Sequence, residues 1–185
     1  MADISKPLIN PLPIDDSIPE IRQVLSRSRS AVLCAPPGAG KTTRIPLALL
    51  NENWLAGRKI IMLEPRRLAV RSCAVHMAGC LGESAGQTIG YRIRFESRVS
   101  PQTRIEVVTQ GVFIRMLQND PGLEDTGLVI FDEFHERNLL NDLGFVFCMD
   151  THTELNESLR LLVMSATIDT KTVADRLDGA PVISA

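Results

Sequence analysis

The stretch AVLCAPPGAGKTT, residues 31–43, decides the fold. The small and apolar residues at its start predict a buried strand. Its two glycines predict a tight loop, and the residues from Lys41 onward predict a helix. This order is typical of a phosphate-binding loop, because backbone N–H groups converge on phosphate oxygens while the helix N-terminus and the lysine add positive charge. The residues expected to bind phosphates are Pro37, Gly38, Ala39, Gly40, Lys41, Thr42 and Thr43.

One position departs from the strict Gly-x-x-x-x-Gly-Lys-[Ser/Thr] pattern, since Ala35 stands where the first glycine is expected. Alanine makes the first turn less permissive, but the amides and the lysine that bind phosphate remain. The Thr42 hydroxyl is expected to bind a magnesium ion. For this segment alone, a glycine-rich turn at a helix start is the alternative interpretation.

Outside this loop, short aliphatic runs alternate with longer helical patterns, which predicts an α/β fold with a mostly parallel central sheet flanked by helices. Strands are expected at 31–35, 59–64, 103–109, 127–133, 159–166 and 181–184. Helices are expected at 17–28, 41–54, 66–81, 111–119, 137–150 and 170–178. Prolines at 7, 11 and 13 favour an extended N-terminal arm over 1–13, followed by one domain over 14–185.

The composition is that of an ordinary globular domain, with 185 residues and a net charge of -2. No apolar run reaches the roughly 18 residues that cross a bilayer, and the N-terminus lacks the pattern of a signal peptide. We therefore expect a soluble, cytoplasmic protein.

The net charge argues against a generic nucleic-acid binder, yet residues 58–104 carry 9 basic and 3 acidic side chains while 105–185 carry 5 basic and 14 acidic side chains. Solvated surfaces alone would also explain this segregation.

The four cysteines are scattered and form no CxxC pair, so reduced, buried side chains are expected. Cys73, His76 and Cys80 have a helical spacing that would place them on one face. We interpret them as the inner stripe of an amphipathic helix rather than a zinc site, because no fourth ligand lies nearby in the sequence.

A second motif follows the apolar run GLVIF at 127–131, where Asp132 and Glu133 come at the expected strand end. In open α/β sheets this end lies beside the phosphate loop, which makes the pair a Walker B arrangement. Asp132 is expected to hold magnesium largely through water, and Glu133, also near the metal, to orient and deprotonate an attacking water. A metalloprotease His-Glu-x-x-His motif is excluded, because Leu139 occupies the position of its second histidine.

The sequence DEFH at 132–135 resembles the Asp-Glu-Ala-His signature of the DEAH-box helicases in superfamily 2, with phenylalanine in place of alanine. Further stretches resemble that family in order: EPRRLA at 64–69 is similar to motif Ia, GYRIRFE at 90–96 to a stretch between motifs Ia and Ib, TQG at 109–111 to motif Ib, and SAT at 165–167 to motif III. The resemblance covers residues from about 12 to 185. It implies the first RecA-like domain of a helicase with ATP and Mg²⁺ as cofactors and RNA as partner.

The resemblance also assigns roles. The residues implied to contact nucleic acid are Arg66, Arg67, Arg92, Arg94, Thr109, Gln110 and Gly111, with Arg98 as an extension. Ser165 and Thr167 are implied to couple nucleotide state to nucleic-acid binding, and Arg71, with His76 as the alternative, to stack on adenine. His135 is implied near the nucleotide and is expected to point toward a neighbouring element rather than the metal.

Other interpretations stay open for several of these residues. Taken alone, Arg66 and Arg67 are two surface arginines, TQG is a helix cap, and Arg94 and Glu96 pair across a hairpin.

A helicase of this superfamily needs a second RecA-like domain with an arginine finger, and no such motif is present in these residues. Such a finger contributes roughly 10³ to 10⁵ in rate in related enzymes, so this chain alone is expected to hydrolyse ATP very slowly. Two alternatives stay open: a nucleotide-binding domain that remodels protein complexes without unwinding, and a P-loop kinase. The kinase interpretation explains neither motif Ia nor the SAT stretch.

Overall fold

The computed structural model describes residues 11–136, 138–166 and 170–185. Thr167 and most of the predicted N-terminal arm lie outside these ranges. The described residues form one sheet in the strand order β4-β3-β5-β2-β6-β7-β1-β8. All neighbouring strands are parallel except β4, which pairs antiparallel with β3. The bounds of the strands are β1 Ser30–Cys34, β2 Lys59–Leu63, β3 Ile89–Ile93, β4 Glu96–Arg98, β5 Ile105–Val108, β6 Thr126–Phe131, β7 Arg160–Ser165 and β8 Val182–Ser184.

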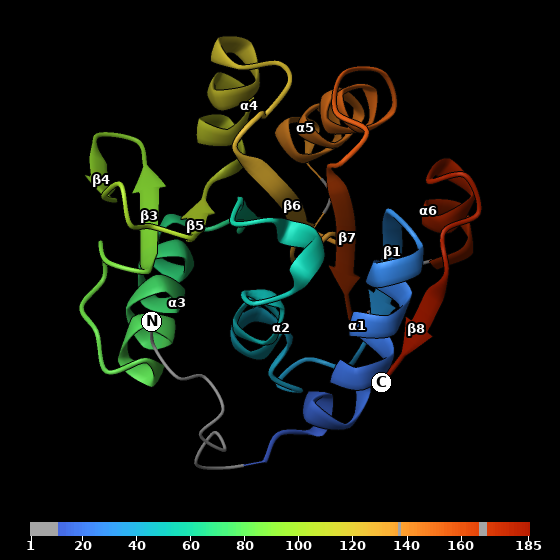
Figure 1. Ribbon diagram of the computed structural model, residues 1–185, viewed down its shortest axis with the longest axis horizontal. Helices are drawn as coiled ribbons and strands as arrows, with labels where there is room; N and C mark the ends of the chain where they lie inside the picture. The colour runs from blue at the N-terminus through green and yellow to red at the C-terminus, as the bar shows by residue number, and fades with distance from the viewer. Residues whose placement is uncertain (1–10, 137, 167–169) are drawn as a thin grey trace.

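In the described residues, six helices cover the two faces of this sheet (Figure 1). One face packs against α1 Ile18–Arg27, α2 Lys41–Leu49 and α3 Arg67–Cys80. The other face packs against α4 Gln110–Asn119, α5 Leu139–Asp150 and α6 Thr170–Arg176. Side chains alternate between the two layers along a strand, as Ile60 and Ile61 show on β2. Both faces of β6 are buried, which explains the continuous apolar run in its sequence.

Three short turns complete the described chain: the 3-10 turns η1 Pro13–Ser17 and η2 Asn53–Leu55, and the π-helical turn η3 Thr151–Leu155. The predicted α/β fold with a mostly parallel sheet is confirmed, and the six predicted strands are present with bounds shifted by one or two residues. The helix predicted over 41–54 is shorter, because α2 ends at Leu49 and the chain turns through η2. No described helix combines the length and hydrophobicity needed to span a bilayer.

The strands β3 and β4 were not predicted as strands. They form a hairpin in which Ile93 pairs with Glu96, so Arg94 and Phe95 make the turn. Phe95 has a left-handed φ of 67° and is 89% exposed, which makes it the tip of the hairpin. Because Glu96 lies opposite Ile93, Arg94 and Glu96 do not face each other across the hairpin. Arg94 instead contacts Phe95, and Glu96 pairs with Arg71.

Candidate active site

The phosphate loop begins where β1 ends and closes at the first residue of α2. Gly38 and Gly40 have φ values of 78° and 97°, the left-handed conformation that glycine adopts without steric cost. Ala35 is not left-handed, and its N–H donates to the Ser165 carbonyl at 3.0 Å as a continuation of the β1–β7 ladder. A glycine is therefore not required at position 35, which accounts for the departure from the strict motif.

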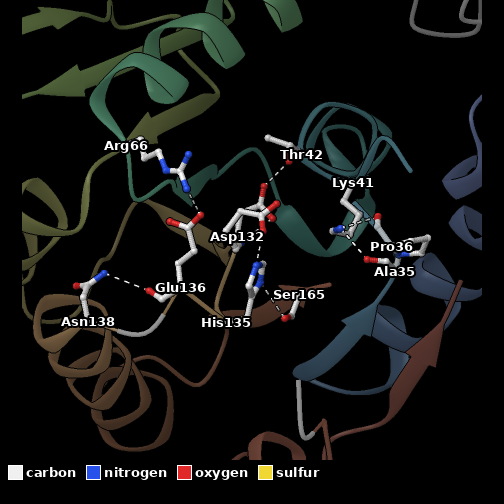
Figure 2. A network of polar contacts seen from close by, with 11 residues as sticks. Ala35, Pro36, Lys41, Thr42, Arg66, Asp132, His135, Glu136, Asn138 and Ser165 are labelled. Atoms are coloured by element: carbon white, nitrogen blue, oxygen red, sulfur yellow. Dashed lines mark hydrogen bonds and ion pairs between the residues drawn. The ribbon is translucent and has the colours of Figure 1, made fainter. Parts of the chain in front are cut away.

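Lys41 is buried under this loop, with 3% of its surface exposed. Its Nζ donates to the carbonyls of Ala35 and Pro36 at 2.8 and 3.0 Å (Figure 2). An ammonium group in so dry a place needs such partners, because burying an unpaired charge costs several kcal/mol or more. The positive charge of the Lys41 ammonium group thus lies inside the loop, beside the N-terminus of α2.

Thr42 and Asp132 connect the loop with the end of β6. The Thr42 hydroxyl donates to Asp132 Oδ2 at 2.5 Å (Figure 2). Asp132 Oδ1 accepts the Glu133 N–H at 2.9 Å. Asp132 is 1% exposed, and burial raises the pKa of its carboxyl to about 6 in spite of these hydrogen bonds. Two oxygen ligands therefore converge from separate elements, which fits a hard cation such as Mg²⁺.

Glu133 adopts a left-handed backbone, with a φ of 48°. Such a conformation costs a residue other than glycine about 1–3 kcal/mol and is concentrated at functional sites. The Glu133 carboxylate lies 3.3 Å from His135 Nε2, and His135 Nδ1 lies 3.3 Å from the Ser165 hydroxyl. His135 thus joins the acidic motif to the end of β7 (Figure 2), the kind of neighbouring contact expected for it.

Glu64, the residue after β2, is a site residue whose role the sequence pattern did not indicate. It is 6% exposed, and its Oε2 has no hydrogen-bond partner among the described residues. Burial, followed by the charges of Asp132, Glu133 and Glu136, raises the pKa of the Glu64 carboxyl to about 8. In the sequence, Glu64 is a carboxylate at the end of an apolar strand and the first residue of the EPRRLA stretch, and neither feature indicates this burial.

On α3, Cys73 lies beside the phosphate loop, with its Sγ 3.8 Å from the Thr42 carbonyl. Burial raises the pKa of its thiol above the usual range. Cys73 is buried, whereas His76 and Cys80 are exposed, so the interpretation of the trio as one inner stripe holds only for Cys73. Cys80 also corrects the expectation of four buried cysteines, and Cys34 is half-buried.

Four of the arginines predicted to contact nucleic acid already have a partner within the protein. Arg66 donates to Glu136 at 2.5 Å (Figure 2), and Arg67 donates to the Arg94 carbonyl at 2.9 Å. The Arg94 guanidinium lies 4.7 Å from the centre of the Phe95 ring. These residues gather around the end of β2 and the β3–β4 hairpin, next to the acidic motif.

Arg92 differs from the others because its partner is deeply buried. Its Nε donates to Glu106 Oε2 at 2.8 Å, and Lys59 Nζ donates to the other carboxylate oxygen at 3.0 Å. Although burial alone would raise the pKa of Glu106, the hydrogen bonds from Arg92 and Lys59 prevail and lower it. This triad links β2, β3 and β5 inside the sheet.

The remaining predicted contacts lie at the start of α4 and on α3. Thr109 occupies the N-cap position without a side-chain capping bond, Gly111 is half-buried, and Gln110 is 6% exposed. Arg71 forms an ion pair with Glu96, which also accepts from the Tyr91 hydroxyl at 2.5 Å. The Glu96 carboxylate of the β3–β4 hairpin thus pairs with Arg71 and not with Arg94. That Arg71 or His76 stacks on adenine stays a prediction.

The chain is similar to known proteins over most of its length. The model of the DEAD/DEAH box helicase family matches residues 16–175. The chain is 48% identical to ATP-dependent RNA helicase HrpB of Escherichia coli K12 over 93% of the chain and 21% of that protein. It is 35% identical to ATP-dependent RNA helicase HrpA of Borreliella burgdorferi, over 94% of the chain and 21% of that protein.

Among solved structures, the chain is similar to that of E. coli DEAH/RHA helicase HrpB. The TM-score is 0.89 at 47% identity, over 94% of the chain and 22% of that structure. The chain spans about a fifth of the length of these relatives. This likeness confirms the RecA-like fold. The chain belongs to the DEAD/DEAH box helicase family.

Proposed function

We propose that this chain is the first RecA-like motor domain of an ATP-dependent RNA helicase, with ATP and Mg²⁺ as cofactors. The observation that carries the proposal is the 2.5 Å contact between Thr42 of the phosphate loop and Asp132 of the acidic motif. It brings a phosphate-binding loop and a carboxylate pair together at the carboxyl edge of the sheet, where open α/β folds bind ligands. The relatives named as ATP-dependent RNA helicases support the same function.

Each site residue then has a chemical task. The amides around Gly38 and Gly40 would hold phosphate oxygens, and Lys41 would leave the Ala35 and Pro36 carbonyls to pair with them. Thr42 and Asp132 fit Mg²⁺, which when bound neutralises charge on the phosphates. Glu133 would orient the attacking water and accept its proton.

His135 and Ser165 would act one step further from the reaction. His135 lies against the Glu133 carboxylate and so restricts where that group points. Ser165 contacts the other ring nitrogen and sits at the end of β7, directly beside β1 and the phosphate loop. A change at the nucleotide phosphates would be transmitted through Glu133 and His135 to Ser165 at the end of β7. These contacts support the coupling role expected for Ser165.

RNA is the proposed partner at Arg66 and Arg67, at the arginines of the β3–β4 hairpin, and at residues 109–111 where α4 begins. A second RecA-like domain elsewhere in the parent protein is the other proposed partner, and it would supply the arginine finger. We propose a cytoplasmic location and a domain over 14–185. Family membership favours this function over a P-loop kinase and over a protein-remodelling domain that does not act on RNA.

Two measurements test the proposal. Lys41→Ala should abolish binding of a fluorescent ADP analogue to the 185-residue chain, because the buried cation is lost. Single-stranded RNA should stimulate ATP hydrolysis by the longer parent protein. Absence of stimulation would contradict the RNA helicase function, and nucleotide binding that survives Lys41→Ala would contradict the assignment of the site.

A further inference from the structure

Residues 12–15, here called the N-terminal buttress, pack against the back of the phosphate loop. The Ile14 N–H donates to the Ala39 carbonyl at 3.1 Å. A Cβ added to Gly40 would lie 2.6 Å from Leu12 Cδ1 and 3.3 Å from Ile14 Cγ2. The loop backbone is therefore in contact with two apolar side chains from a segment that precedes α1.

The buttress is itself fixed in place. Ile14 is fully buried in the core cluster beneath α1 and α2, and Leu12 packs against the same cluster. Asp15 Oδ2 accepts the Leu12 N–H at 2.9 Å, and Asp15 Oδ1 lies 3.5 Å from Arg44 Nε. Arg44 is on α2, one turn after Lys41, so the buttress contacts the loop and the helix that follows it.

We propose that Leu12 and Ile14 are positioning residues that hold the phosphate loop in its nucleotide-binding shape. This inference rests on the proposed function, and it adds a determinant outside the region matched by the family, which begins at residue 16. Gly40 tolerates its left-handed φ without cost, but the same freedom lets an unsupported glycine loop adopt many other conformations. The buttress removes that freedom before the nucleotide arrives, so the nucleotide binds a loop that is already ordered.

The test uses the 185-residue chain and the fluorescent nucleotide mant-ADP with Mg²⁺. Leu12→Ala should weaken binding about tenfold, since the nucleotide must then order the loop itself. Leu12→Met, which keeps most of the apolar volume, should restore most of the affinity. The matched control is Val24→Ala, because Val24 is also a partly buried side chain on the same core cluster but lies on α1.

A second readout separates positioning from general stability. Amide hydrogen exchange of the loop residues 38–43 should be faster in Leu12→Ala and unchanged in Val24→Ala. Unchanged affinity in Leu12→Ala, or equal losses in Leu12→Ala and Val24→Ala, would overturn the inference while leaving the proposed function intact. If the unaltered chain does not bind mant-ADP, the proposed function fails and this inference with it.

Discussion

Replacing Glu64 by glutamine should stabilise the protein, and the gain should grow with pH. Glu64 is buried, its Oε2 has no hydrogen-bond partner in the part of the chain that the structure describes, and three other carboxylates lie close by. Burial and these charges raise the pKa of its carboxyl from 4.5 to about 8. Glutamine has nearly the same shape, cannot ionise, and offers an N–H₂ group to the neighbouring carboxylates.

The magnitude follows from linkage. Between pH 4.5 and about 8 the folded state keeps the Glu64 proton, whereas the unfolded state releases it, so the free energy of unfolding falls as pH rises. A rise from 4.5 to about 8 corresponds to about 5 kcal/mol at 1.36 kcal/mol per pKa unit. Local relaxation around the carboxylate reduces the cost of ionisation, and we expect a gain of about 2–4 kcal/mol at the alkaline end.

Urea unfolding of both proteins from about pH 5 to about pH 8 measures this gain directly. Asp132, whose pKa is also raised, is present in both proteins, so its own titration largely cancels in the difference. Glu106→Gln is the matched control and should destabilise the fold, because the lowered pKa of Glu106 means that its ionised form is stabilising. This stabilisation is lost only as pH falls below 4.5, so the effect of Glu106→Gln should stay constant from about pH 5 to about pH 8. Parallel pH profiles for Glu64→Gln and the unaltered protein would refute the reasoning.

Three further predictions concern nucleotide and RNA. Glu133→Gln should leave nucleotide affinity unchanged and stop ATP turnover in the longer parent protein, and equal ATPase rates for the variant and the unaltered protein would remove Glu133 as the base. Arg66→Ala combined with Arg67→Ala should weaken RNA binding and flatten its salt dependence, as a salt titration of affinity would show. Gly40→Ala should lower thermal stability and abolish mant-ADP binding, because alanine is strained at a φ of 97° and its Cβ meets Leu12.

The loop at 35–42 and the acidic pair could be predicted because their signals are local. Glycine spacing before a lysine, and an apolar strand that ends in carboxylates, specify the backbone with little help from the rest of the fold. Topology then brings the two together: β7 lies between β1 and β6, so Thr42 reaches Asp132 across one strand.

The parts that could not be predicted depend on distant residues. Arg92 is joined to Glu106 only because β3 and β5 are neighbours, and a strand order cannot be read from one sequence. Gln110 is polar yet buried at the start of α4, and the periodicity of the helix alone does not indicate that burial. Leu12, the first residue of the N-terminal buttress, was expected in the extended arm over 1–13, because the prolines mark a break in regular structure but do not show what Leu12 contacts.

Charge pairing also decides which arginines are available to the proposed RNA partner. Part of the excess of basic residues over 58–104 is neutralised by carboxylates from later in the chain, because Arg66 pairs with Glu136 and Arg92 with Glu106. The Arg66 pair is exposed, and such pairs contribute about 0–1 kcal/mol, so a phosphate can displace Glu136 at little cost. Displacing Arg92 would leave Glu106, which is 1% exposed, with Lys59 alone, and removing a partner from a buried charge costs about 3–5 kcal/mol. We therefore expect Arg66 to carry RNA affinity and Arg92 to serve chiefly to hold the sheet together.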